Sequence, residues 1–167
     1  MLQRQYDAFM ACDADYTDAS IVLFGAPFDS TTSNRPGARF GPRAIRQESF
    51  GLETYSPWLD RDLADLSVFD AGDLELPFGD SEKALALVRE QTSIILKDGK
   101  LPFLLGGEHS LTLGGVEAAL ERYPNLHLIH FDAHTDLRDE YLLSANYYHS
   151  KSKVEINKLY IYSQSVN

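Results

Sequence analysis

Four short apolar runs, separated by loops and by stretches of helical composition, restrict this chain to few folds. The runs cover residues 21–24, 66–69, 101–105 and 126–131. Each is followed directly by glycine or aspartate. The continuous apolar run at 21–24 is typical of a strand buried on both faces of a parallel sheet, and we expect the same of the run at 101–105. Because strands and helices alternate along the chain, the sequence predicts an α/β fold with a parallel sheet covered by helices on both faces.

Helical composition fills three stretches: residues 43–49, 81–97 and 110–122. The longest is the best defined, since Asp80 or Ser81 can cap its first turn and Gly99 follows as a stop signal. Ser110 can cap the next helix in the same way. We also expect a helix or arm over residues 1–18, an acidic turn over residues 70–80 and a strand over residues 154–162.

Composition argues against several classes of protein. At 167 residues with 44% hydrophobic side chains, the chain is long enough for one domain with a hydrophobic core. A net charge of −10 makes nucleic acid and anionic membranes poor partners, whereas a cationic substrate suits it. Cys12 is the only cysteine, residues 1–17 lack a signal-peptide pattern, and no apolar run approaches the roughly 20 residues of a membrane span. We therefore expect a cytoplasmic protein.

The last apolar run ends in three side chains that can bind metal. Asp132, His134 and Asp136 occupy every second position. Side chains alternate between the two faces of a strand, so this spacing points all three the same way near the strand's carboxyl end. Two carboxylates and an imidazole that converge in this manner are costly unless a positive charge lies between them. The pattern favours a metal site.

A second motif, Gly-Gly-Glu-His-Ser at residues 106–110, follows the third run. The paired glycines allow close backbone packing and place His109 at the start of the next helix. If the third and fourth runs form neighbouring strands, His109 lies within reach of Asp132 and Asp136. Such an oxygen-rich set with two imidazoles favours Mn²⁺ over structural zinc, and a shared carboxylate would make a two-metal site.

Other polar residues have structural as well as functional interpretations. We interpret His130 as a satisfied core histidine and His127 as structural or semi-exposed. Glu108 either supports a metal ligand or is a solvated acid at a helix start. The long loop at residues 28–41 is of a kind that often carries function. Four arginines in and after this loop could bind an anion but more commonly form ion pairs: Arg35, Arg39, Arg43 and Arg46.

Several motifs, in order, resemble those of the ureohydrolase (arginase/agmatinase) family. They are Gly-Ala-Pro-Phe-Asp at 25–29, Arg-Pro-Gly-Ala-Arg-Phe-Gly-Pro at 35–42, Gly-Gly-Glu-His-Ser at 106–110 and Phe-Asp-Ala-His-Thr-Asp at 131–136. The segments at 53–57 and 136–141 look most like those of bacterial agmatinases. The resemblance covers about residues 15–141.

This resemblance implies a three-layer α/β/α fold, of which the chain holds the N-terminal half, and a centre with two Mn²⁺ ions. By motif, His109 and Asp136 would bind one ion and His134 the other, with Asp132 as the bridge. A metal-bound hydroxide would convert agmatine, a small cationic guanidino compound, into putrescine and urea. The resemblance also suggests a homo-oligomer.

The end of the chain departs from the family pattern. Residues 142–167 contain no glycine, proline or aspartate. The family's later Ser-His-Ala segment and its Asp-x-Asp metal motif have no counterpart here, and His149 is only a weak candidate for the histidine of the former. We therefore divide the chain into residues 1–141, the first part of an arginase-like domain, and an atypical tail at 142–167. We expect this chain alone to bind metal weakly and to have little agmatinase activity.

Two alternatives stay open from the sequence. One is a non-catalytic fragment of a ureohydrolase, whose incomplete sheet would expose an unpaired edge. The other is a hydrolase of the same fold with a different substrate, such as a guanidinobutyrase or a formimidoylglutamase.

Overall fold

The computed structural model describes residues 7–32, 34–132, 140–141, 144–145 and 158–162. The elements in chain order are β1 (Ile21–Ala26), α1 (Gly41–Ser49), β2 (Tyr55–Ser56), β3 (Arg61–Asp62), β4 (Val68–Asp73), α2 (Ser81–Lys97), β5 (Leu101–Gly106), α3 (Thr112–Arg122), β6 (His127–Phe131), β7 (Glu140–Tyr141), β8 (Ser144–Ala145) and β9 (Lys158–Tyr162). Short 3-10 turns cover Ala38–Phe40, Leu63–Asp65 and His109–Leu111.

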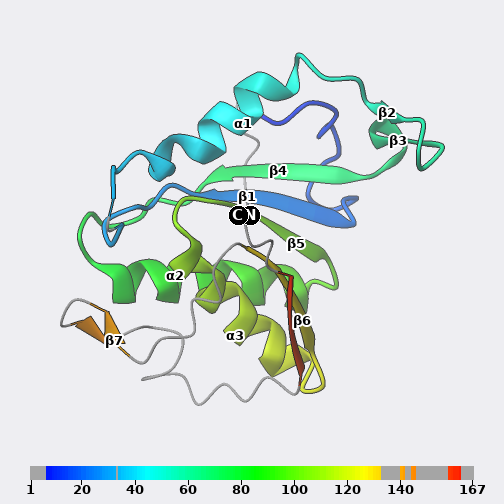
Figure 1. Ribbon diagram of the computed structural model, residues 1–167. Coiled ribbons are helices and arrows are strands. Elements are labelled where there is room, and N and C mark those ends of the chain that lie inside the picture. Colours follow the sequence, from blue (N-terminus) through cyan, green and yellow to red (C-terminus); the bar gives the residue numbers. More distant parts are fainter. Residues whose placement is uncertain (1–6, 33, 133–139, 142–143, 146–157, 163–167) are drawn as a thin grey trace.

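A three-stranded parallel sheet in the order β4-β1-β5 lies between two layers of helix. Helix α1 covers one face, and α2 and α3 pack side by side on the other (Figure 1). The predicted three-layer α/β/α arrangement is therefore confirmed. Since all three strands run in one direction, their carboxyl ends meet at the same edge of the sheet.

The central strand β1 holds the core together because it contributes apolar side chains to both layers. Val22 and Phe24 pack with Ile95 of α2, whereas Leu23 packs with Leu105 of β5 on the opposite side. All of these side chains are buried. This alternation follows from the two-residue period of a strand, so one short apolar run contributes buried side chains to the hydrophobic clusters on both faces of the sheet.

Helix α2 begins and ends where its sequence predicts. The Asp80 side chain accepts a hydrogen bond of 3.0 Å from Lys83 N, which satisfies one of the unpaired amides of the first turn. Gly99 follows the helix with a φ of +74°, the left-handed conformation that glycine adopts without steric cost. Its neighbour α3 begins differently: Ser110 lies within a 3-10 turn and makes no cap, so that part of the prediction is wrong.

Strand β4 runs into the stretch predicted as an acidic turn. Asp70 and Asp73 are strand residues, and Asp70 is completely buried. The N-terminal arm lies beside this strand, with Asp13 bridged to Phe69 and Ala14 N donating to Val68 O at 3.2 Å. Residues 7–18 contain no helix, so the described part of the predicted helix or arm is an arm.

Strand β6 does not join the main sheet. It pairs in parallel with β9, which forms part of the predicted strand at 154–162, and among the described residues it has no pairing with β5. The condition under which His109 would reach the carboxylates after β6, that the third and fourth runs form neighbouring strands, is therefore not met in the part of the chain described. The side chains of Ile129 and Phe131 are exposed, as are Leu101 and Phe103 of β5, so neither run is buried on both faces.

Within the described ranges, no helix is both long enough and apolar enough to cross a membrane.

Candidate functional site

The carboxyl ends of β1 and β5 approach each other closely at one edge of the sheet. Glu108 N donates a hydrogen bond of 2.8 Å to Phe28 O, which ties the turn after β5 to the loop after β1. Gly107 has a φ of +50°, and a Cβ atom there would lie 2.4 Å from Ala26 O. Only glycine permits this approach of backbone to backbone. The paired glycines therefore act as the sequence predicts, by bringing two strand ends together.

Asp29 folds the loop at residues 28–41 back onto the end of β1. Its buried carboxylate accepts hydrogen bonds from Gly37 N at 2.6 Å, Arg39 N at 3.3 Å and Arg39 Nη1 at 3.0 Å. Burial acts to raise the pKa of Asp29, but the amides of Gly37 and Arg39 and the Arg39 guanidinium outweigh it, so the pKa lies below its usual value. The carboxylate is thus ionised and fully engaged in shaping the loop.

Glu108 joins the same loop to the turn that carries His109. It is buried, which excludes the interpretation as a solvated helix-start acid. Its carboxylate accepts hydrogen bonds from Thr31 N at 3.0 Å and from the hydroxyls of Thr31 and Ser110. The Glu108 side chain therefore joins the loop after β1 to the turn after β5, beside the predicted metal ligand His109. The sequence analysis did not identify Thr31 and Ser110 as the residues whose hydroxyl groups bind Glu108.

The predicted metal ligands are placed only in part. His109 lies in the 3-10 turn after β5, and Asp132 follows β6 directly. His134, Asp136 and the weak candidate His149 lie outside the described residues. Across the part of the chain that the structure describes, no three histidine, cysteine or acidic side chains gather closely enough to hold a metal ion. The predicted convergence of His109 with the carboxylates after β6 thus stays a prediction.

At the end of β6, one pair of alternate residues can be compared with the expected two-residue period of a strand. His130 Nε2 lies 4.0 Å from Asp132 Oδ2, which places these two alternate residues on the same side of the chain. His130 is half-buried rather than a core residue, so its interpretation as a core histidine is wrong. His127 is exposed, which fits its interpretation as a structural or semi-exposed residue better than a place in the core.

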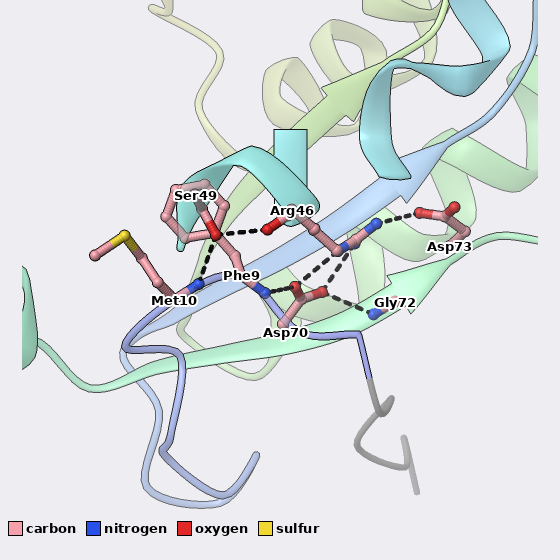
Figure 2. Close-up of polar contacts among 7 residues, drawn as sticks. All are labelled: Phe9, Met10, Arg46, Ser49, Asp70, Gly72 and Asp73. Atoms are coloured by element: carbon pink, nitrogen blue, oxygen red, sulfur yellow. Dashed lines mark hydrogen bonds and ion pairs between the residues drawn. The ribbon is translucent and has the colours of Figure 1, made fainter. Parts of the chain in front are cut away.

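Figure 2 shows a charge network around the buried side chains of Arg46 and Asp70, whose partners the sequence did not identify. Arg46 of α1 donates from Nε and Nη2 to the two oxygens of Asp70, each at 2.8 Å, and from Nη1 to Asp73 Oδ1 at 2.5 Å. Asp70 also accepts from Phe9 N at 2.8 Å and Gly72 N at 2.9 Å. Burial acts to lower the pKa of Arg46, but its hydrogen bonds to the two carboxylates outweigh this and raise it.

Two of the four arginines form ion pairs in the described structure. Arg46 pairs with Asp70 and Asp73, and Arg39 pairs with Asp29, so the ion-pair interpretation holds for both. Arg46 is buried and donates from Nε, Nη1 and Nη2, so it is not left to bind an anion.

Comparisons with known proteins agree with the fold. Residues 19–161 match the sequence model of the Arginase family. An agmatinase of Bacillus subtilis (strain 168) is 51% identical over 133 residues, which are 80% of this chain and 46% of that protein. The structure of an agmatine ureohydrolase of Thermoplasma volcanium superposes with a TM-score of 0.78 at 35% identity, over 87% of this chain and 48% of that one.

A third relative is a formiminoglutamase of Trypanosoma cruzi, whose crystal structure was solved with Mn²⁺. It has a TM-score of 0.69 at 29% identity and covers 77% of this chain and 44% of its own. The chain spans about half the length of the curated relatives it matches. The family match also extends past residue 141, into the stretch that we expected to be unlike the family. The length of this match and its agreement with the observed fold show that the chain belongs to the arginase family.

Proposed function

We propose that this chain carries the first half of the metal site of an agmatinase-type hydrolase, which cleaves a small guanidino cation such as agmatine into an amine and urea. The observation that carries the proposal is the 51% identity to an agmatinase over 133 residues. The formiminoglutamase with Mn²⁺ is less similar, at 29% identity. Agmatine is therefore favoured over formimidoylglutamate, and guanidinobutyrate has no specific observation in its support.

Four residues would hold the metal: His109, Asp132, His134 and Asp136. Imidazole and carboxylate are donor types that suit Mn²⁺, and the ligands of the described part follow the carboxyl ends of strands, where ligands gather in α/β folds. When bound, two Mn²⁺ ions supply an activated water and stabilise negative charge on the substrate. The Arginase-family match supports this assignment.

The remaining residues at this edge prepare the site rather than bind metal. Glu108 holds the His109 turn against the loop at residues 28–41, and Asp29 keeps that loop folded. Because both carboxylates already accept hydrogen bonds from several donors, they are poor candidates for additional metal ligands. The net charge of −10 favours the approach of a cationic substrate.

The first experiment is a Mn²⁺ titration of the purified chain, followed by electron paramagnetic resonance. We expect weak binding, because the chain lacks the family's Asp-x-Asp motif. His109→Ala should weaken it further by at least about tenfold, since even residues that only support metal ligands cost 10- to 100-fold. His127→Ala, an exposed histidine of β6, is the matched control and should bind as the unmodified chain does. Equal affinities for the two variants would contradict the assignment of His109.

The second experiment measures urea released from agmatine by the Mn²⁺-loaded chain. We expect little turnover. Robust hydrolysis would overturn the proposed impairment while supporting the proposed reaction. Parallel assays of 4-guanidinobutyrate and formimidoylglutamate on a longer homologous protein test the substrate, and a preference for either would replace agmatine.

A further inference from the structure

Two neighbouring residues of the turn after β5 have opposite environments. Glu108 is buried, whereas His109, the predicted metal ligand next to it, is exposed. Leu111, two residues further on, is buried in the cluster that contains Ala26 and Phe28. The turn is therefore held from within on both sides of His109. The groups that hold Glu108 thus also set the position from which the His109 side chain projects.

Glu108 is attached to the loop at residues 28–41 at two separate points. Its amide donates a hydrogen bond of 2.8 Å to Phe28 O. Its carboxylate accepts two hydrogen bonds from Thr31, one at Oε2 from the amide at 3.0 Å and one at Oε1 from the hydroxyl. A single contact would let Glu108 pivot, but two contacts to different residues of one loop fix both its position and its orientation.

Thr31 is the main donor to this buried carboxylate. It supplies two of the three hydrogen bonds that the carboxylate accepts from described residues, and Ser110 supplies the third. Thr31 is itself exposed, so the carboxylate is satisfied from the surface of the molecule. Without the Thr31 hydroxyl, Oε1 would keep only Ser110 among these donors, and a buried carboxylate with fewer donors is less stable in its place.

Thr31 is held by the contacts of the residues on either side of it. Ser30 Oγ accepts a hydrogen bond from Gly79 N at 3.1 Å, which joins Ser30 to the loop before α2. Thr32 donates from its hydroxyl to Asp29 O at 2.9 Å. Figure 1 shows that the loops after β1 and β4 lie at the same end of the sheet. Thr31 is thus fixed in place, as a residue that positions another side chain must be.

We propose that Thr31 is a positioning residue for the metal ligand His109 and that it acts through Glu108. The inference rests on the proposed function, because it takes His109 as a metal ligand. Residues that hold a metal ligand in place change metal affinity without touching the ion. The linkage is reciprocal, since a contact that favours metal binding is itself favoured when the metal is bound. Metal binding at His109 then stabilises the loop at residues 28–41.

Mn²⁺ titration of the full 167-residue chain, followed by electron paramagnetic resonance, is the first test. Thr31→Val removes the hydroxyl and keeps the branched side chain. We expect it to weaken binding about tenfold, the lower end of the range for residues that support metal ligands, because the Thr31 amide and Ser110 still donate. Thr31→Ser keeps a hydroxyl and should bind as the unmodified chain does. Thr32→Val is the matched control, because it removes a neighbouring hydroxyl whose described partner is Asp29 O.

Combination with His109→Ala separates a positioning role from a general loss of structure. If Thr31 acts through His109, Thr31→Val should have no further effect on the residual Mn²⁺ binding of His109→Ala. A second tenfold loss in the double variant would mean that Thr31 affects the metal by another route, which overturns the proposal. Urea denaturation checks that the variants are folded. If Thr31→Val is not, Ser110→Ala removes the other hydroxyl bound to Glu108 and should weaken binding in the same way.

Two further readouts do not involve activity. In nuclear magnetic resonance spectra of the metal-free chain, the ring signals of His109 should shift in Thr31→Val, while those of His127 in β6 stay unchanged. Hydrogen exchange at the Thr31 amide of the unmodified chain should slow when Mn²⁺ is added, because this amide donates to Glu108. His109 signals that do not move, or exchange that ignores the metal, would contradict the inference.

The outcomes distinguish this inference from the proposed function. The inference is overturned if Thr31→Val leaves the Mn²⁺ affinity unchanged while His109→Ala lowers it. If His109→Ala binds Mn²⁺ as the unmodified chain does, the assignment of His109 as a metal ligand fails, and the linkage between the metal and the loop fails with it.

Discussion

At the scale of single residues, the loops and strands around the candidate site are held together by buried carboxylates. Each of these carboxylates accepts hydrogen bonds from several donors. From described residues, Asp70 accepts four hydrogen bonds and Glu108 accepts three, and both are buried. A buried carboxylate is stable only when its oxygens are satisfied, so each position depends on partners distant in the sequence. Arg46 is the partner of Asp70 that carries the compensating charge.

Substitution of Arg46 tests this dependence. Arg46→Met keeps the apolar stem but leaves Asp70 buried without a positive partner, so we expect the free energy of unfolding to fall by about 3–5 kcal/mol. Urea denaturation measures the change. Arg43→Met, at an exposed position on the same helix, is the control and should change stability by about 0.5 kcal/mol or less. Similar losses in the two variants would mean that the buried pair contributes little.

Loss of the ion pair between Arg46 and Asp70 should also loosen the N-terminal arm. Asp70 accepts from Phe9 N, and Ser49 Oγ accepts from Met10 N at 3.0 Å, so this network attaches the start of the arm to α1 and β4 (Figure 2). Hydrogen exchange at Phe9 and Met10 should be faster in Arg46→Met. Unchanged exchange would show that the arm is held elsewhere.

At the scale of elements, the contact between α2 and α3 is set by one small residue. Gly114 of α3 faces α2, and a Cβ atom there would lie 2.6 Å from Leu85 O and 3.2 Å from Arg89 N. These are backbone atoms, so they cannot move aside as a side chain would. Gly115, the next residue, has its nearest such atom, Thr92 Oγ1, at 4.0 Å.

This pair of glycines provides a matched comparison. Gly114→Ala should destabilise the fold by about 1–3 kcal/mol, because the two helices must separate to make room. Gly115→Ala should be neutral or stabilise it by up to about 1 kcal/mol, since alanine is the better helix former and space is present. Thermal and urea unfolding of both variants measure the difference. Equal stability would indicate that the helices separate without cost.

At the scale of the whole molecule, the arm and the far end of α2 are joined at the edge of the sheet opposite the candidate site. Tyr16 Oη donates to Asp98 Oδ2 at 2.5 Å, and the Tyr16 ring packs edge-on against Phe69. Partial burial, then the hydrogen bond to Asp98 and its negative charge, raise the pKa of Tyr16 to about 12. This contact therefore makes the stability of the fold depend on pH in the alkaline range.

The sign of this coupling follows from proton binding. In the unfolded chain a tyrosine releases its proton near pH 10, whereas folded Tyr16 retains it until about pH 12. The folded state then binds more protons, so stability falls as pH rises from about 10 to about 12. Tyr16→Phe should lose less stability over this interval than the unmodified chain. Tyr123→Phe, at a tyrosine that lies against Arg122, should behave as the unmodified chain does; a decline that is the same in all three proteins would contradict the coupling.

The sequence by itself determined the main helices, the central strand and the family of this protein. Helix α2, strand β1 and the close approach at Gly107 follow from caps, apolar runs and paired glycines, because these features act between residues near one another in the chain. The motifs at residues 25–29 and 106–110 identified an arginase-like fold that the comparisons confirm. The metal ligands remain a prediction of the same motifs.

Only the tertiary structure decided which strands are neighbours and what each buried carboxylate binds. Parallel strands are joined by helices rather than tight turns, so order along the chain does not dictate order in the sheet, and β6 pairs with β9 instead of β5. Asp70 is part of a strand because Arg46 compensates its charge, and Glu108 is buried because Thr31 and Ser110 satisfy it. Such partnerships arise from distances in the folded chain, which no local pattern encodes.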